Sequence, residues 1–109
     1  ISYNEFEKVD IRLGTIIEAK EYDGLRQPSM LIKIDFGNEI GIKKSSAQLR
    51  KNYKSSNLVN KQVIAVINLK PKQIGRIISE VLVLALPDQE NEAILISPSI
   101  NLENGVKLY

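Results

Sequence analysis

The chain has 109 residues, of which 43% are hydrophobic and 26% charged, and its formal net charge is +2. This size predicts a single domain over residues 1–109, and this composition excludes an intrinsically disordered chain. The sequence contains neither cysteine nor histidine, which excludes disulfides, Ser–His or Cys–His catalysis, and the usual ligands of zinc and most transition metals.

The same composition bears on activity and location. The acidic residues are scattered along the sequence and do not pair convincingly, so we expect no enzymatic activity, no cofactor and no metal. No apolar run approaches the roughly 20 residues that a membrane-spanning helix needs. The N-terminal residues are polar and partly acidic, unlike a secretory signal. Together with the absence of cysteine, these features predict a cytoplasmic protein.

Three strands are predicted in the first part of the chain. In Asp10–Tyr22 apolar and polar residues alternate, and Gly14 indicates a bulge or a close approach of another segment. A second strand, Met30–Phe36, and a third, Glu39–Ser45, are separated by a Gly37-Asn38 turn, as in a β-hairpin. The face of the first strand that the alternation predicts to be apolar carries Ile11, Leu13, Thr15, Ile17 and Ala19.

The hydrophobic period changes after the third strand. Within Ser45–Tyr53, either Ser45 or Ser46 can cap a short helix whose apolar residues recur at helical spacing. This helix would lead to a fourth strand, Gln62–Asn68, which is apolar on both faces and should therefore lie inside the sheet.

The last part of the chain is predicted to contain one long strand and two short ones. A loop around Pro71 leads into the long strand, Arg76–Leu86. An acidic turn then separates this strand from the two short candidates, Ala93–Ser97 and Gly105–Tyr109.

This order of elements is typical of the OB-fold, a small Greek-key barrel that often binds nucleic acids. The predicted fold is therefore all-β: a five-stranded OB-fold barrel with a short helix between strands 3 and 4. SH3-like and other small barrels are the competing interpretations. Both ends of the chain, Ile1–Val9 and Val106–Tyr109, carry apolar residues beyond those that such a barrel requires. We expect these terminal extensions to form the interface of a homodimer.

Charge is unevenly divided along the chain. The segment from Ile40 to Ser79 contains no Asp or Glu but nine of the 15 basic residues, and the rest of the chain holds all 13 acidic ones. In a small domain, such a segment favours a positive surface that binds a polyanion such as nucleic acid, with a solvated charged face as the alternative. Its basic residues are Lys43, Lys44, Arg50, Lys51, Lys54, Lys61, Lys70, Lys72 and Arg76.

Nine residues on or next to the predicted strands are candidates for contacting RNA. Pro71 restrains the loop that carries Lys70 and Lys72, so these cations would be presented at little ordering cost. Short polar side chains at strand ends suit phosphate or sugar oxygens, although Asn68 could instead be a turn residue and Ser79 a core hydroxyl bonded to a carbonyl. The candidates are Lys43, Lys44, Ser45, Ser46, Asn68, Lys70, Lys72, Arg76 and Ser79.

The predicted helix adds to the same site. Lys43 and Lys44 end the third strand next to Ser45 and Ser46, where amides at the helix N-terminus could contact an anion. Only Tyr53, among the six aromatic residues, lies in the basic segment. This shortage favours recognition of the backbone shape of a folded RNA over stacking of its bases.

Five stretches along the chain resemble the tRNA-binding domain family, in the same order and with matching spacing. They are FEKVDIRLGTI, IDFG, KKSSAQL, NKQVIAVINLKPKQI and SEVLVLA. The chain is most similar to the CsaA branch, whose members are small cytosolic proteins described as export-related chaperones. The resemblance implies an OB barrel with short terminal extensions that form a homodimer, and tRNA as the partner.

The sequence departs from many tRNA-binding members at two places. Ser45-Ser46 stands where they carry Ser-Gly at the end of the third strand. Gly75-Arg76 reverses their Arg-Gly, and only Ser79 is kept from the Ser-x-Gly-Met that follows.

Two binding functions are therefore open, beside the plainer interpretation of an assembly module that has lost ligand binding. The first is a non-catalytic tRNA-binding protein that uses its basic surface. The alternative, implied by the CsaA branch, is a chaperone that binds unfolded polypeptides or preproteins in an apolar pocket. Pro28, Met30 and Leu82 would support such a pocket, with a core or turn role as the alternative for each of them.

Overall fold

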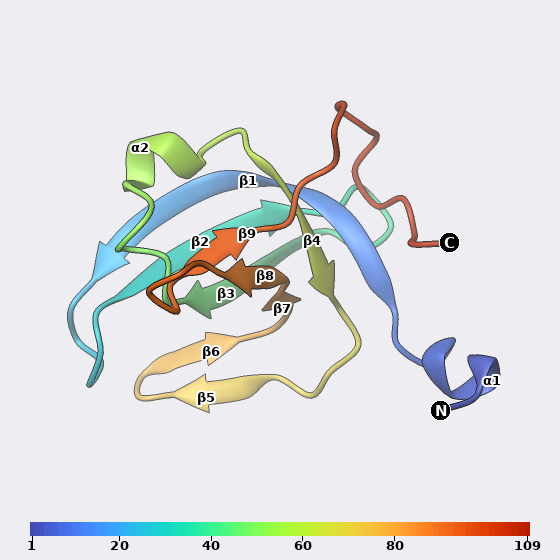
Figure 1. The fold of residues 1–109 in the computed structure, drawn as a ribbon, viewed down its shortest axis with the longest axis horizontal. Helices are drawn as coiled ribbons and strands as arrows, with labels where there is room; N and C mark the ends of the chain where they lie inside the picture. The colour runs from blue at the N-terminus through green and yellow to red at the C-terminus, as the bar shows by residue number, and fades with distance from the viewer.

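A five-stranded antiparallel sheet forms the body of the protein in this computed structural model, which describes residues 1–109 (Figure 1). The strands follow the order β3-β2-β1-β4-β7, with the long β1 in the middle. They are β1 (Ile11–Tyr22), β2 (Ser29–Asp35), β3 (Ile42–Ala47), β4 (Gln62–Val66) and β7 (Leu82–Val83). The sheet curls until β3 approaches the chain before β7, which gives the nearly closed all-β barrel that the sequence predicts.

Six shorter elements surround this barrel. The hairpins β5–β6 and β8–β9 are separate two-stranded sheets. In Figure 1 the β5–β6 hairpin extends below the barrel, and both chain ends lie on the side away from α2. The six elements are α1 (Tyr3–Phe6), α2 (Ser55–Leu58), β5 (Lys72–Ile74), β6 (Ile77–Ser79), β8 (Ala85–Pro87) and β9 (Ala93–Leu95). Neither helix has the length and apolar character needed to cross a membrane.

The core is built from side chains that point into the barrel from β1, β2 and β4. Met30, Ile32 and Ile34 share the inner face of β2, as the alternation predicts, and all three are buried. Burial of each such side chain contributes about 1.5–3 kcal/mol. Leu58 belongs to the same cluster and anchors α2 to the core. β4 lies between β1 and β7, so the prediction of an internal fourth strand is confirmed.

A β-bulge in β1 shifts the predicted alternation by one residue. The register passes from Ile16 opposite Ile34 to Glu18 opposite Lys33, which makes Ile17 the extra residue. Ile16 is therefore fully buried, at 0% exposure, whereas Ile17 is 41% exposed. The prediction that Ile17 belongs to the apolar face is wrong, because Ile16 takes the core position and Ile17, the extra residue of the bulge, is left exposed.

A helix does connect strands 3 and 4, but it does not lie where the sequence predicts it. β3 continues through Ser45 and Ser46, and α2 begins only at Ser55, in a stretch predicted to be a loop. The Ser45 hydroxyl donates to the Val81 carbonyl (3.2 Å) and the Ser46 amide donates to the Ser79 hydroxyl (3.1 Å). These contacts with a distant segment outweigh the local preference of serine for a helix cap.

The predicted long strand Arg76–Leu86 is divided into β6, β7 and β8. Its backbone pairs first with β5, then with β4 and finally with β9. Between these pairings, the Glu80 amide donates to the Lys44 carbonyl (2.8 Å) and the Leu84 amide donates to the Ile64 carbonyl (2.9 Å). Side chains keep alternating between the two faces while the backbone changes its pairing partner. An alternating sequence pattern therefore does not show where one strand ends and the next begins.

The C-terminal segment (residues 98–109) covers the part of β1 that extends beyond β2. There the Leu13 amide donates to the Val106 carbonyl (3.1 Å), and the Leu108 amide donates to the Ile11 carbonyl (2.9 Å). This pairing is too short to form the C-terminal strand that the sequence predicts. It nevertheless covers an exposed edge of β1.

The close approach that the sequence indicates at Gly14 is confirmed, and it yields a prediction. A Cβ atom there would lie 2.6 Å from Cγ2 of Ile34 and 2.7 Å from Cδ1 of Phe36, both in the core. We expect Gly14→Ala to lower the free energy of unfolding, measured by denaturant titration, by about 1–3 kcal/mol. In Gly24→Ala the new Cβ would meet only the flexible end of the Tyr22 side chain, so this control should cost less than about 0.5 kcal/mol. Equal costs would contradict the role of Gly14.

Candidate functional site

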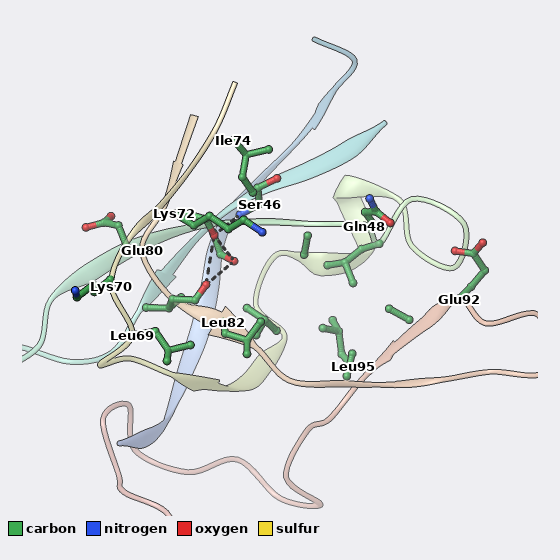
Figure 2. Close-up of a pocket in the computed structure, with 18 of the residues that line it drawn as sticks. Ser46, Gln48, Leu69, Lys70, Lys72, Ile74, Glu80, Leu82, Glu92 and Leu95 are labelled. Carbon is green, nitrogen blue, oxygen red and sulfur yellow. Dashed lines mark hydrogen bonds between the residues drawn. The ribbon is translucent and has the colours of Figure 1, made fainter. Parts of the chain in front are cut away.

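A cavity of about 470 Å³ lies where β3, the β5–β6 hairpin and the β8–β9 hairpin meet. Five of the nine predicted site residues line it. Figure 2 shows Lys70 and Lys72 on one side of the cavity, and Gln48 and Glu92 on the other. The five predicted residues in the lining are Ser45, Ser46, Lys70, Lys72 and Ser79.

Apolar side chains occupy the wall between these two polar sides. Leu69 and Leu82 are 51% and 52% exposed, while Leu95, which also lines the cavity, is buried. In Figure 2 the three leucines lie along one side of the cavity. A concave apolar strip with charged residues at its ends is typical of a binding site.

Three serine residues line the cavity where β3 meets the end of β6. The Ser79 hydroxyl accepts from the Ser46 amide (3.1 Å) and lies 3.5 Å from the Ser45 hydroxyl. It also lies 3.4 Å from the Val81 carbonyl, to which it can donate. Ser79 therefore joins two segments of the barrel, as the core-hydroxyl alternative for this residue requires, and it borders the cavity at the same time.

Lys70 and Lys72 are the cations of the cavity. Lys72 begins β5, and Lys70 lies in the connection from β4, with Pro71 between the two lysines. All three residues are exposed, and neither lysine takes part in any of the four ion pairs of the structure. Their ammonium groups are therefore available to an anion at the edge of the cavity.

Arg76 lies at the tip of the β5–β6 hairpin and does not line the cavity. Ile74 pairs with Ile77, so only Gly75 and Arg76 form the turn. Gly75 has a φ of +61°, a left-handed conformation that favours glycine at the first position of such a tight turn. A Cβ on Gly75 would lie 2.9 Å from Cδ2 of Leu25. The tip of the hairpin therefore rests on the loop between β1 and β2.

Three other predicted site residues lie outside the cavity. Lys43 and Lys44 stand within β3 and not at its end, and α2 begins far beyond them. The predicted anion contacts from helix amides beside these lysines are therefore wrong. Asn68 accepts from the Asp10 amide (2.9 Å) and donates to the Lys8 carbonyl (2.7 Å), so it fastens the N-terminal segment to the end of β4.

The segment Ile40–Ser79, which contains no acidic residue and is called the acid-free segment below, is contacted in the folded chain by acidic residues from elsewhere. Arg50 is hydrogen-bonded to Asp23 and lies 3.4 Å from Glu21. The bond to Asp23 raises the pKa of Arg50. Lys61 lies 6.0 Å from the centre of the Tyr53 ring. The segment is continuous in sequence, but only part of it contributes unpaired charge.

Asp88 holds the turn of the β8–β9 hairpin, which forms one wall of the cavity. Its carboxylate accepts from the amides of Glu92 (2.9 Å) and Glu90 (2.8 Å) and from the side-chain amide of Asn52 (3.0 Å). The bonds from Glu92 and Asn52 lower the pKa of Asp88. The bond to Asn52 also ties the hairpin to the loop before α2.

Most residues of the apolar wall could not be predicted from the sequence. Leu95 could not be recognised as a cavity residue from the sequence. The alternation places this leucine on one face of a strand but does not show which residues that face contacts. Leu69 does carry a signal, since it is an apolar residue inside a predicted basic loop. Of the residues expected to support a peptide pocket, Leu82 lines the cavity, Pro28 is exposed outside it, and Met30 is fully buried in the core. Met30 is therefore a core residue, as the alternative for this residue predicts, and does not support a peptide pocket.

Comparison with known proteins gives one family and two kinds of relative. The sequence profile of the tRNA binding domain matches residues 11–107. The methionine–tRNA ligase of Pyrococcus horikoshii is 36% identical over 108 residues, which are 99% of this chain and 14% of the ligase. That of Leptospira biflexa is 39% identical over 85 residues, which are 78% of this chain and 12% of the ligase. The chain thus spans only a small part of these enzymes.

Solved structures resemble the chain over its whole length. The CsaA chaperone protein of Picrophilus torridus is 45% identical with a TM-score of 0.92, and the alignment covers 100% of this chain and 99% of that one. The chaperone CsaA of Bacillus anthracis is 38% identical with a TM-score of 0.93, covering 100% and 98%. A methionyl-tRNA synthetase-related protein of P. horikoshii shares the fold, with a TM-score of 0.87 at 20% identity, covering 100% and 97%.

The β8–β9 wall of the cavity should loosen in acid. The folded-state pKa of Asp88 lies below its ordinary value of 3.8. Its hydrogen bonds therefore contribute stability that is fully present above that value and is lost as the pH falls through the lower, folded-state pKa. In an NMR titration we expect the Asp88 carboxyl to titrate below pH 3.8, and the amide signals of Glu90 and Glu92 to move with the same midpoint. Asp88→Ala should abolish this shared midpoint. A carboxyl midpoint at or above 3.8 would show that the bonds do not favour the charged form.

Proposed function

Since the chain belongs to the tRNA-binding domain family, in its CsaA-like branch, we propose that it binds folded tRNA through the phosphate backbone and catalyses no reaction. The observation that carries this proposal is the position of Lys70 and Lys72, two unpaired cations at the edge of a concave site. The methionine–tRNA ligases are far longer than this chain, so the proposal concerns binding alone.

The local backbone supports the presentation of these two cations. Pro71 fixes φ between them, and Lys72 pairs with Ser79 in the β5–β6 ladder. A cation on a restrained backbone loses little conformational freedom when it meets a phosphate. Each phosphate that is neutralised also releases condensed counterions, which supplies affinity without regard to base sequence.

The aromatic residues support recognition of the RNA backbone. Tyr53 is the single aromatic residue of the acid-free segment, and it is half-buried. Its hydroxyl accepts from the Leu95 amide (3.1 Å), which gives the ring a structural role. No aromatic residue lines the cavity. Binders of single strands usually stack bases on aromatic faces, so these features favour a folded RNA that is recognised by shape.

The apolar wall of the cavity favours a second candidate function, the binding of an extended segment of unfolded polypeptide. Leu69 and Leu82 offer exposed apolar surface next to polar groups, which suits a chain of mixed side chains. The similar structures from P. torridus and B. anthracis are described as chaperones, which supports the same role here. tRNA remains the first candidate because the family profile covers residues 11–107.

We further propose that the protein acts as a cytoplasmic homodimer. Tyr3 and Phe6 of α1 are exposed, as are Leu108 and Tyr109 of the C-terminal segment, and both chain ends lie on the same side in Figure 1. A second copy could cover both groups of apolar side chains in one symmetric interface. A cytoplasmic location agrees with tRNA as the partner.

The test of tRNA binding is a titration of labelled tRNA at several salt concentrations. Removal of two phosphate contacts in the variant with Lys70→Ala and Lys72→Ala should weaken the binding of different tRNAs by similar factors. The slope of log affinity against log salt should become shallower by roughly one to two units. The free energy of unfolding should change by less than about 0.5 kcal/mol, because both lysines are exposed.

A matched control removes the same charge from the same acid-free segment. Lys51→Ala with Lys54→Ala changes two exposed lysines outside the cavity lining, and it should leave most of the affinity intact. Ser79→Ala should lower the melting temperature, because this hydroxyl joins β3 to the end of β6. If the cavity variant kept full affinity and an unchanged slope, the phosphate-binding role would be rejected. Loss of unfolded-polypeptide binding in Leu82→Ser would then favour the second function.

The dimer is tested by light scattering, which should give the mass of two chains. Tyr3→Ser with Leu108→Ser should shift the mass to that of one chain, because it removes apolar surface from both terminal segments. Point substitutions are preferable to truncation, since the C-terminal segment also pairs with β1. Ile17→Ser with Val59→Ser, at exposed apolar sites elsewhere, should leave the dimer intact. A single-chain mass for the unmodified protein would rule the dimer out.

A further inference from the structure

We propose that the outer face of β1, β2 and β3 carries a second phosphate-binding groove for the backbone of the same RNA, built from Lys20, Lys33 and Lys44. This inference rests on the proposed binding of tRNA and extends it to a face outside the cavity. A hollow of about 170 Å³ is lined by eight residues, among them these three lysines, one acidic residue, Glu18, and Ile77 of β6. Lys20 and Lys33 lie outside the acid-free segment, so the charge pattern of the sequence does not point to them.

Strand register brings the three lysines together. Lys33 lies directly opposite Lys44 in the β2–β3 pair and directly opposite Glu18 in the β1–β2 pair. Lys20 follows two residues after Glu18 and therefore lies on the same face of β1. The Cβ atoms of directly opposite residues are about 5 Å apart, and those of diagonal neighbours about 7 Å. All four side chains are exposed.

The bulge in β1 is what places Lys20 on this face. Ile16 points into the core, so uninterrupted alternation would turn Glu18 and Lys20 inward as well. The extra residue, Ile17, reverses the parity of the strand. As a result Ala19 packs against the core, while Glu18 and Lys20 face outward. The β-bulge thus places Ala19 against the core and Lys20 on the outer face with the other lysines.

The groove holds more positive charge than its acidic neighbour can neutralise. Like charges directly opposite each other destabilise a strand pair. Glu18 lies 3.1 Å from Lys33, but neither Lys20 nor Lys44 takes part in an ion pair. Glu80 accepts from the Lys44 amide (3.0 Å), and it lines the cavity but not the groove. An anion bound between Lys20 and Lys44 would therefore reduce the repulsion among the lysine side chains, which Glu18 alone does not neutralise.

Phosphate suits this groove in chemistry and in position. Ammonium groups bind phosphate as point charges, and Ile77 together with the lysine stems gives the hollow apolar sides that reduce solvent screening. Ser45 lines both the groove and the cavity, so the two sites adjoin each other, and β6 lies between β5, which carries Lys72, and β3, which carries Lys44. An RNA backbone lying across β6 would meet Lys72 on one side and Lys44 on the other.

The experiment uses the full chain and labelled tRNA over a range of salt concentrations. Lys20→Gln with Lys44→Gln should weaken binding at least about fivefold near 0.1 M salt and make the salt slope shallower by roughly one to two units. The control, Lys51→Gln with Lys54→Gln, removes the same charge outside the groove and should have a smaller effect on both quantities. Thermal unfolding confirms that each variant is folded.

Glu18→Gln gives a readout of opposite sign. It releases Lys33 from its ion pair, so it should tighten tRNA binding and steepen the salt slope. A purely structural role of the Glu18–Lys33 pair would weaken binding or leave it unchanged, and that result would overturn the proposal.

The groove and the proposed function can fail separately. If the protein binds tRNA and Lys70→Ala with Lys72→Ala weakens that binding, the proposed function stands. The groove alone is then rejected if Lys20→Gln with Lys44→Gln behaves like the control. If the unmodified protein does not bind tRNA, both proposals are rejected.

Discussion

The edge of β3 imposes the constraint on which the rest of the structure depends. A sheet edge exposes amides and carbonyls that must find partners, and no regular strand ladder completes this one. Glu80 bonds to the backbone of Lys44 twice, by its amide and by its carboxylate, and the Ser46 amide donates to the Ser79 hydroxyl. Because these bonds close the barrel, they also fix where the β5–β6 hairpin leaves it. The positions of the cavity and of the adjoining groove follow from this closure.

The position of the unpaired cations distinguishes the proposed binding surface better than total charge does. The formal net charge is only +2, and several cations are held by acids, such as Arg12 by Asp10 at 2.7 Å. Over distances beyond about 10 Å such a nearly balanced surface is screened at moderate salt, so long-range attraction of RNA is weak. Affinity would instead come from short-range contacts at cations without an acid partner, such as Lys70 and Lys72. This is why their geometry matters more than their number.

The parts of the fold that could be predicted are those that depend on neighbours in sequence. The alternation of β2 and the turn at Gly37 identify the hairpin that anchors the barrel. The extent of β3 could not be predicted, because Ser45 bonds to Val81, a residue far along the chain. The same distinction holds for the site. The acid-free segment leads to Lys72, whereas Lys20 lies among acidic residues in the sequence and reaches the outer face only through a bulge and strand register.

The pairing of the C-terminal segment with β1 has a consequence for how the protein is made. The Arg12 guanidinium donates to the Gly105 carbonyl at 2.9 Å, across 93 positions of sequence. During synthesis on the ribosome, β1, β2 and β4 are made before Gly105, and the free edge of β1 stays open until the C-terminal segment is added. Contacts between distant residues form slowly, and an open strand edge on a partly made chain can pair with a neighbouring chain. The protein should therefore be most prone to aggregation in the interval just before its last contacts are synthesised.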